Sequence, residues 1–246
     1  MSTRRIAMWS GPRNISTALM RSFENRADTV VCDEPLYGYY LNETGIDHPM
    51  AGDIIADMEC DWRSVTAALS GPVAGGAAYS YQKHMTHHLL DGMARDWMDD
   101  LVNCFLIRNP AEVIASYAAK RDHITLDDIG MVQQNEIYSY LHTRTGRRPV
   151  VIDARDVLIN PQAMLHALCD AIAIPFDEAM LHWPTGRRDS DGVWAAHWYH
   201  NVEASSGFAP YTPQEIDLNP DHAALAEACE PHYQELYRHR LQAKSL

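Results

Sequence analysis

The chain has 246 residues and a formal net charge of −13 at pH 7, and this length suffices for one large α/β domain with a sizeable core. Such an acidic chain is a poor general partner for nucleic acid or an anionic membrane, and charged residues interrupt every apolar stretch before it could span a bilayer. Too few apolar residues follow the basic start for a signal-peptide core, and five scattered cysteines without CxxC spacing favour a reduced, cytoplasmic protein.

Short apolar runs alternate with helical patterns along the first two thirds of the chain, which is typical of a parallel sheet covered on both faces. The predicted strands are residues 5–10, 29–33, 78–83, 102–108 and 149–153. The predicted helices are residues 15–26, 86–98, 110–121, 127–145, 160–173 and 221–242. The sequence therefore predicts a single α/β domain over residues 1–246, with a central, mainly parallel sheet flanked by helices.

Residues 184–213 depart from this alternation. They are rich in Gly, Asp, Ser and Pro, and five aromatic residues are spaced closely in and beside them: Trp183, Trp194, Trp198, Tyr199 and Phe208. Long ordered loops of this kind are usually functional. We expect the segment to form a lid or an acceptor-pocket loop over the ligand edge of the sheet.

The loop between the first predicted strand and the first predicted helix suits an oxyanion. It reads Ser-Gly-Pro-Arg-Asn-Ile-Ser-Thr over residues 10–17. The Gly-Pro pair allows a tight turn, and the helix that follows points its free N–H groups back into the loop. Together with the guanidinium of Arg13 and the hydroxyls of Ser16 and Thr17, these groups predict a phosphate or sulfate site.

This loop departs from the phosphate loop of an NTPase or nucleotide kinase, which needs GxxxxGK[ST]. The second Gly and the Lys-Ser/Thr pair are missing, and only the apolar run 150–153, which ends in Asp153, is a weak candidate for a magnesium partner. A cysteine phosphatase loop does not fit either, because no Cys lies in residues 10–17. A magnesium-dependent phosphoryl transferase therefore stays an alternative with little support.

A second motif lies almost a hundred residues later. Residues 105–117 read FLIRNPAEVIASY, which predicts a strand followed by a helix that begins at Pro110. Arg108 at the end of the strand and Ser116 on the helix can then meet one phosphate. Together with residues 10–17, this segment resembles the two phosphate sites of sulfotransferases that use 3′-phosphoadenosine-5′-phosphosulfate (PAPS).

The resemblance implies a P-loop-like fold of the sulfotransferase type and a role for individual residues. In that family a basic residue just after the Pro contacts the bridging oxygen and the sulfuryl group, and this position is Arg13. Ser16 and Thr17 would hold the 5′-phosphate, and Arg108 with Ser116 the 3′-phosphate. A guanidinium can stabilise charge on the leaving oxygen without any metal.

Two further segments resemble a bacterial and plant branch of the same family. Residues 32–37 carry an acidic residue before a Pro, and residues 81–88 are similar to the pattern K-[DH]-M-x-H-[HY]. Near the C-terminus, an Arg-Arg pair occupies the region where many members have an Arg-Lys-Gly loop for PAPS. The residues assigned to PAPS binding are Gly11, Pro12, Arg13, Asn14, Ser16, Thr17, Arg108, Ser116, Arg187 and Arg188.

Transfer to a hydroxyl or an amine requires a general base near the transferred group. His87, which follows a predicted strand, titrates near neutral pH, whereas Glu34, at a strand end beside the anion loop, would need its pKa raised by burial. Both candidates stay open. With Arg13 and with Lys83 of the segment 81–88, they are the predicted catalytic residues.

The histidines could instead bind a metal ion. Spacings of three and four place several of them on shared helical faces: His84, His87, His88, His197 and His200. However, the chain has no HExxH motif and no acidic third ligand at helical spacing. The sequence therefore predicts no metal site.

The sequence thus predicts a transferase that moves a sulfuryl group from PAPS, its co-substrate, to a small or lipophilic acceptor. The acidic chain disfavours a polyanionic glycan as acceptor, and the aromatic segment 184–213 suits an apolar one. The alternative is a P-loop-type nucleotide-binding protein, or a phosphotransferase like a nucleotide kinase, that keeps the sheet and the loop. The sequence leaves the oligomeric state open.

Overall fold

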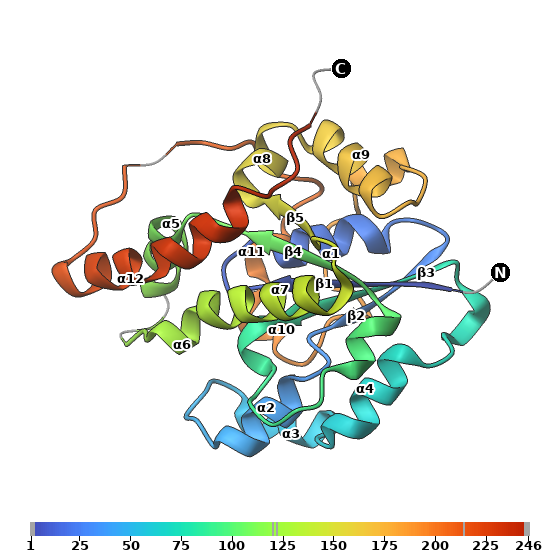
Figure 1. The fold of residues 1–246 in the computed structure, drawn as a ribbon, viewed down its shortest axis with the longest axis horizontal. Helices are drawn as coiled ribbons and strands as arrows, with labels where there is room; N and C mark the ends of the chain where they lie inside the picture. Colours follow the sequence, from blue (N-terminus) through green and yellow to red (C-terminus); the bar gives the residue numbers. More distant parts are fainter. Residues whose placement is uncertain (1–2, 120, 122, 214, 244–246) are drawn as a thin grey trace.

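The computed structural model describes residues 3–119, 121, 123–213 and 215–243. Five strands form one sheet in the order β2-β3-β1-β4-β5, and all four neighbouring pairs are parallel (Figure 1). The strands are β1 (Arg4–Ser10), β2 (Thr29–Asp33), β3 (Tyr79–Met85), β4 (Val102–Ile107) and β5 (Val150–Asp153). The predicted α/β class is confirmed, and each predicted strand is present.

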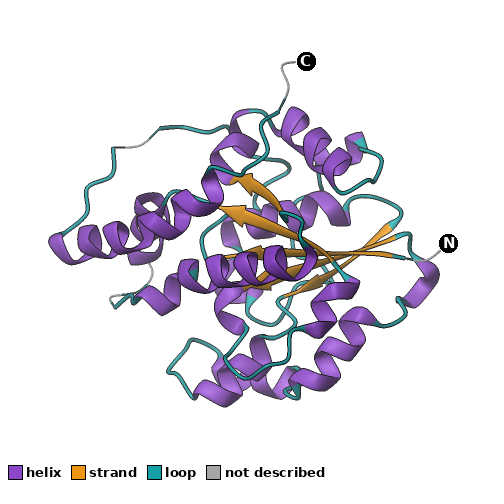
Figure 2. Cartoon of the chain, viewed as in Figure 1, coloured by secondary structure: helices purple, strands orange, loops and turns teal. Residues whose placement is uncertain are grey.

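Helices cover both faces of this sheet (Figure 2). The α-helices are α1 (Ser16–Glu24), α2 (Tyr37–Thr44), α3 (Ala51–Asp57), α4 (Trp62–Ser70), α5 (Pro110–Ala118), α6 (Leu126–Ile129), α7 (Met131–Thr145), α8 (Ala154–Ile159), α9 (Pro161–Ala171), α10 (Ala195–Trp198), α11 (His200–Glu203) and α12 (Pro220–Tyr237). Short 3-10 turns are η1 (Ala74–Gly76), η2 (Thr86–His88), η3 (Asp96–Asp100) and η4 (Glu178–Leu181).

The central strand β1 explains the two-sided core. Its side chains alternate between the faces: Ile6 and Met8 pack with residues of α1, α8 and α9, whereas Ala7 and Trp9 pack with residues of α4, α5, α7 and α12. All four are fully buried. Where both faces of a strand are covered its residues form a continuous apolar run, as in residues 6–9 of β1, and this run predicts the strand from the sequence.

One predicted helix is wrong. Residues 86–98 form the short turns η2 and the start of η3, joined by an irregular stretch in which Gly92 has a φ of 86°. The predicted helix 127–145 is divided into α6 and α7 at Gly130, whose φ is 69°. Helices α2, α3, α4, α8, α10 and α11 were not predicted, because each has nine residues or fewer and is too short to show a helical period over several turns.

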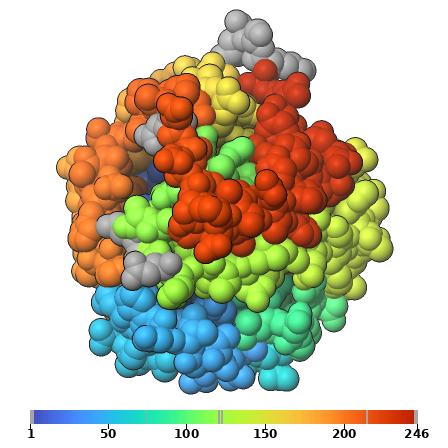
Figure 3. Space-filling model, turned by 90° about the vertical axis from the view of Figure 1, so that its left-hand side faces the viewer, coloured from blue at the N-terminus to red at the C-terminus, as the bar shows by residue number. Residues whose placement is uncertain are grey.

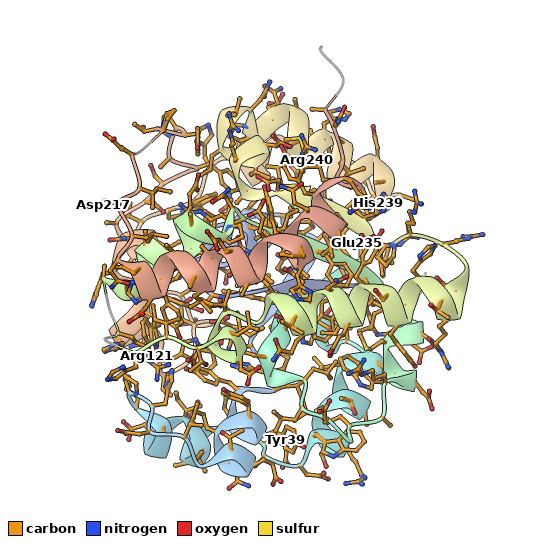
Figure 4. All side chains as sticks on the ribbon, turned by 60° about the vertical axis from the view of Figure 1, so that its left-hand side comes forward. Tyr39, Arg121, Asp217, Glu235, His239 and Arg240 are labelled. Atoms are coloured by element: carbon orange, nitrogen blue, oxygen red, sulfur yellow. The ribbon has the colours of Figure 1, made fainter. Side chains whose placement is uncertain are left out.

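The last long helix, α12, lies across α5 and α7, with Glu235 in its last turn and His239 and Arg240 just beyond its C-terminal end (Figure 4). Arg240 pairs with Asp156 of α8 at 2.8 Å, which ties this end to the β5 side of the sheet. No helix within the described ranges is long and apolar enough to cross a membrane.

The sheet order determines where a ligand can bind. The chain leaves β1 for β2 and β3 on one side and later reaches β4 on the other side. In open parallel sheets, ligands bind at the carboxyl ends of the strands beside such a reversal of strand order. The loops after β1, β2, β3 and β4 meet at this edge.

Candidate active site

A cavity of about 400 Å³ lies at this edge of the sheet. Its walls come from the loop after β1, the ends of β2 and β3, helix α5, and the segment 194–209. Figure 3 looks onto this edge, where dark-blue atoms from the start of the chain lie at the bottom of a hollow beside the orange segment. Cavities of this size, with few polar groups among apolar walls, are typical of small-molecule sites.

The loop after β1 has the backbone shape of an anion site. Arg13 and Ile15 lie in the left-handed region, with φ of 58° and 51°, and the side-chain amide of Asn14 donates to the carbonyl oxygen of Leu106 at 2.7 Å. Ile15 precedes α1 and offers no side-chain cap to its first N–H groups. These donors therefore face the cavity end of the loop, where a bound anion would satisfy them.

Gly11 lets this loop lie against the chain before α7. A Cβ atom at this position would lie 2.5 Å from the carbonyl oxygen of Ile129, which is closer than any side chain allows. Gly11 itself does not line the cavity. In the structure, Gly11 therefore supports the loop that carries the cavity-lining residues, although it was predicted to bind the ligand itself.

Two arginines from distant parts of the chain meet at this loop. Nε of Arg13 donates to Oγ of Ser116 at 3.0 Å, and Nη1 of Arg108 donates to the main-chain oxygen of Arg13 at 2.8 Å. Burial lowers the pKa of Arg13 from its usual value, and the neighbouring charge of Arg108 lowers it further. Two cations held this close favour an anion between them.

The Arg108 side chain is oriented by α5 and by the segment after α11. Its Nε pairs with Glu112 at 2.9 Å, and the other carboxylate oxygen of Glu112 accepts from the Tyr211 hydroxyl at 2.9 Å. Asn109 caps α5 by accepting from the N–H groups of Ala111 and Glu112. The cap, with Pro110 at the first helical position, fixes where the helix begins relative to the arginine.

A buried ionic cluster lies beside this cavity at the ends of β2 and β3. Nζ of Lys83 contacts Asp33 at 2.8 Å, Glu34 at 2.5 Å and the Tyr199 hydroxyl at 2.7 Å. The register places Asp33 and Lys83 opposite one another in the β2–β3 pair. Glu34 follows β2 with a φ of 45°, so its carboxyl leaves the strand line and lines the cavity.

In this cluster, the Lys83 ammonium group is the shared partner of the Asp33 and Glu34 carboxylates. Burial raises the pKa of Glu34, and the nearby charge of Asp33 adds to this rise while Lys83 opposes it. Burial alone would lower the pKa of Lys83, but Asp33 and Glu34 outweigh it and keep the ammonium protonated. A carboxylate with a raised pKa beside the reaction space is suited to take up a proton.

The histidines of residues 84–88 are neutral. Burial lowers the pKa of His84 to about 3 and that of His87 to about 4, and it lowers the pKa of His88 strongly. His87 and His88 line the cavity, whereas His84 stacks on Trp9 in the core. Among the described residues, no group of three His, Cys, Asp or Glu side chains could hold a metal ion.

Aromatic rings form the far end of the cavity. Tyr37 stacks on His88 with ring centroids 4.5 Å apart and lies edge-on to Trp194 at 5.2 Å. Its hydroxyl is within 3.0 Å of a ring nitrogen of His48. Other rings that line the cavity are Tyr117, Trp198, Tyr199 and Phe208. Uncharged side chains thus dominate this end.

Most of the predicted site residues line the cavity, and a few do not. Those that line it are Pro12, Arg13, Asn14, Ser16, Thr17, Glu34, Lys83, His87, Arg108 and Ser116. Arg187 is exposed, and the N–H of Arg188 donates to Asp191 at 2.8 Å. Neither arginine lines the cavity, so their predicted contact with PAPS has no geometric counterpart here.

Several residues of the site do not follow from the sequence. Tyr37 belongs to α2 and His48 to the loop before α3, and nothing in the spacing of these two residues indicates a cavity. Glu112 lies within the motif 105–117 in the first turn of α5, whereas Arg108 lies before that helix begins, so the helical spacing rule does not predict their ion pair. Tyr199 was counted only as one of the aromatic residues.

Comparison with known proteins gives a consistent result. The family model described as Sulfotransferase domain matches residues 4–239. Two curated proteins of Arabidopsis thaliana, "Branched-chain-amino-acid aminotransferase-like protein 2" and "protein 1", are 37% and 36% identical over 98% of this chain. The chain spans only 43% of the length of either relative.

Three solved structures share the fold. The sulfotransferase domain from the curacin biosynthetic pathway has a TM-score of 0.53 at 16% identity and covers 94% of this chain and 98% of its own. The sulfotransferase domain of the Synechococcus PCC 7002 olefin synthase has a TM-score of 0.51 at 20% identity, over 92% and 94%. A sulfotransferase from Alicyclobacillus acidocaldarius has a TM-score of 0.53 at 13% identity, over 98% of each chain.

Proposed function

Because this chain belongs to the sulfotransferase domain family, we propose that it transfers a sulfuryl group from PAPS to a hydroxyl or amine of a small or lipophilic acceptor. The observation that carries the proposal is the meeting of Arg13, Ser116 and Arg108 beside the open first turn of α1. These groups come from two motifs that are far apart in the sequence and face one cavity.

The residues present fit a donor with two separate phosphate groups. Arg108 has Nε bound to Glu112 and Nη1 bound to Arg13, which leaves Nη2 for an anion. Ser16 and Thr17 are the first two residues of α1 and line the same cavity. In this proposal, Ser16 and Thr17 hold the 5′-phosphate, Arg108 and Ser116 hold the 3′-phosphate, and Arg13, which is hydrogen-bonded to both Ser116 and Arg108, contacts the bridging oxygen.

In the proposed reaction, PAPS supplies a sulfuryl group whose bond to the phosphate oxygen breaks while the acceptor oxygen or nitrogen attacks sulfur. Arg13 and the first N–H groups of α1 stabilise the negative charge left on the phosphate side. Glu34 takes the acceptor proton, because its raised pKa brings it closer to neutral pH, whereas burial lowers the pKa of His87 to about 4 and makes it a weaker base.

The aromatic end of the cavity supports an acceptor with little charge. Its rings and neutral imidazoles offer apolar faces and few partners for a charged group. A charged acceptor would lose its hydration there without compensation. An acceptor that packs against Tyr37, Trp194 and Trp198 would bring its hydroxyl or amine toward Glu34.

Calorimetry with 3′-phosphoadenosine 5′-phosphate tests the donor assignment. We expect binding that is unchanged when magnesium is replaced by EDTA, and weaker binding of ADP, which lacks the 3′-phosphate. Tighter binding of ADP with magnesium would instead indicate a P-loop-type nucleotide-binding protein or a phosphotransferase. Absence of any binding of the 3′-phosphorylated nucleotide would contradict the proposed function.

A further inference from the structure

The hydroxyl of Tyr199 is the meeting point of a buried hydrogen-bond network. It donates to Oδ2 of Asp33 at 2.6 Å and accepts from Nζ of Lys83 at 2.7 Å and from Nε1 of Trp194 at 3.2 Å. A tyrosine hydroxyl has one donor and two acceptor positions. All three are used, and the side chain is buried.

The ammonium group of Lys83 is equally saturated. Its three protons have three oxygen partners, on Asp33, Glu34 and Tyr199, and the side chain is 2% exposed. No N–H of this lysine is left over for a bound molecule in this arrangement. Lys83 can therefore influence the reaction by setting the place and charge of Glu34, without touching the transferred group.

We propose that Tyr199, together with Asp33 and Lys83, is a positioning residue that holds Glu34 at the reaction space. The role as base for Glu34 rests on the proposed function, whereas the network itself does not. Tyr199 comes from the segment 184–213, and the other three residues come from the ends of β2 and β3. The same hydrogen bonds therefore hold this segment against the sheet and fix the position of Glu34.

The charges predict what the network does. The titratable groups that face the Glu34 carboxyl are Asp33, Tyr37, Lys83, Tyr117 and Tyr199. Without the Tyr199 hydroxyl, Asp33 loses a donor and draws the Lys83 ammonium toward itself. The Lys83 ammonium then stabilises the Glu34 carboxylate less, so the charged form of Glu34 is less favoured. Without the Asp33 charge, the ammonium stabilises the Glu34 carboxylate more.

Two substitutions with opposite expected effects test this network. Protein labelled with carbon-13 at the glutamate carboxyl carbon is titrated by NMR, and the Glu34 signal is assigned by its loss in Glu34→Gln. We expect Tyr199→Phe to raise the apparent pKa of Glu34 by about one pH unit. Asp33→Asn should lower it, so the two variants bracket the wild type.

Tyr233→Phe is the matched control, because it removes a buried hydroxyl that donates to another buried carboxylate, Asp153, outside the cavity. It should leave the Glu34 titration unchanged, and thermal melts confirm that each variant is folded. A Glu34 titration unchanged or lowered in Tyr199→Phe, or unchanged in Asp33→Asn, would overturn the proposal. Calorimetry with 3′-phosphoadenosine 5′-phosphate tests the donor site separately, so failure of one proposal is not mistaken for failure of the other.

Discussion

Nη1 of Arg108 donates to the main-chain oxygen of Arg13 at 2.8 Å. This bond joins the loop after β1 to the end of β4, and the Arg13 side chain returns the contact by donating to Ser116 of α5. The two motifs therefore support one another. A substitution in one motif should therefore weaken the binding of a ligand group held by the other motif.

Ser116→Ala tests the hydroxyl in this contact. The substitution removes the partner of Arg13 and one expected donor to the 3′-phosphate. A lost hydrogen bond of this kind is worth about 1 kcal/mol, so the Kd for 3′-phosphoadenosine 5′-phosphate should rise about fivefold. Ser70→Ala removes a hydroxyl bound to a backbone carbonyl at the end of α4 and should leave binding unchanged; equal effects of the two would argue against the contact.

Glu34→Gln and His87→Asn distinguish the two candidate bases. With radiolabelled PAPS and a panel of small aromatic and aliphatic alcohols, Glu34→Gln should lower the transfer rate by about 10²- to 10⁴-fold. His87→Asn should lower it much less, because the pKa of His87 near 4 makes it a weak base at neutral pH. A larger loss in His87→Asn, with nucleotide binding intact in both variants, would assign the proton to His87.

The pH dependence of Glu34 follows from its raised pKa. The rate with the same acceptors should fall as the pH drops through the pKa of Glu34, because only the carboxylate accepts a proton. In His87→Asn this fall should stay at the same pH. A profile that is flat down to pH 4 would contradict a raised pKa for the group that acts as base.

A buried ion pair holds residues 188–191 against α1. Arg21 contacts Asp191 at 2.6 Å and Glu24 at 3.1 Å, and both the Arg21 and Asp191 side chains are almost fully buried. Arg21→Met leaves the Asp191 charge without its partner and should reduce the free energy of unfolding by about 3–5 kcal/mol. Urea denaturation measures this, and Arg144→Met, at an exposed pair with Asp99, should change little. Similar losses in both variants would contradict the buried pair as an anchor.

Asp153 makes stability depend on pH. Burial raises its pKa to about 6 in the folded protein, above the value near 4 of an unfolded chain. Its protonation therefore favours folding: the contribution is complete below about pH 4 and is lost as the pH rises through about 6. Asp153→Asn should stabilise the protein relative to wild type at pH 8 by about 2–3 kcal/mol and by about half as much at pH 5. The same difference in urea denaturation at both pH values would refute this.

The sequence predicted the parts of the fold that follow from local patterns. Strands β1 and β4 each contain a run of four apolar residues, 6–9 and 104–107, because both faces of the strand are buried there. The segment 86–98 was misread, because its apolar residues pack from an irregular turn at Gly92 instead of from a helix. Helix α2, rich in Tyr, carries no helical period that would distinguish it from a loop.

Most residues of the candidate site could be predicted from the sequence, but the contacts between them could not. The two phosphate motifs could be found, because each depends on residues close together in the sequence. The pairing of Arg13 with Ser116, the left-handed backbone at Arg13 and Glu34, and the three partners of Lys83 depend on how distant segments pack. Local spacing contains none of this information. The contact of Arg187 and Arg188 with PAPS stays a prediction.

The binding preference of Arg108→Ala tests the central claim most directly. Calorimetry should show that the wild type binds 3′-phosphoadenosine 5′-phosphate more tightly than ADP, and that Arg108→Ala loses about 1.5–3 kcal/mol more of binding to the former than to ADP. Arg144→Ala, which removes the same charge from an exposed pair away from the cavity, should keep the preference. Equal loss for both nucleotides in Arg108→Ala, or a preference that survives it, would contradict a 3′-phosphate site at Arg108.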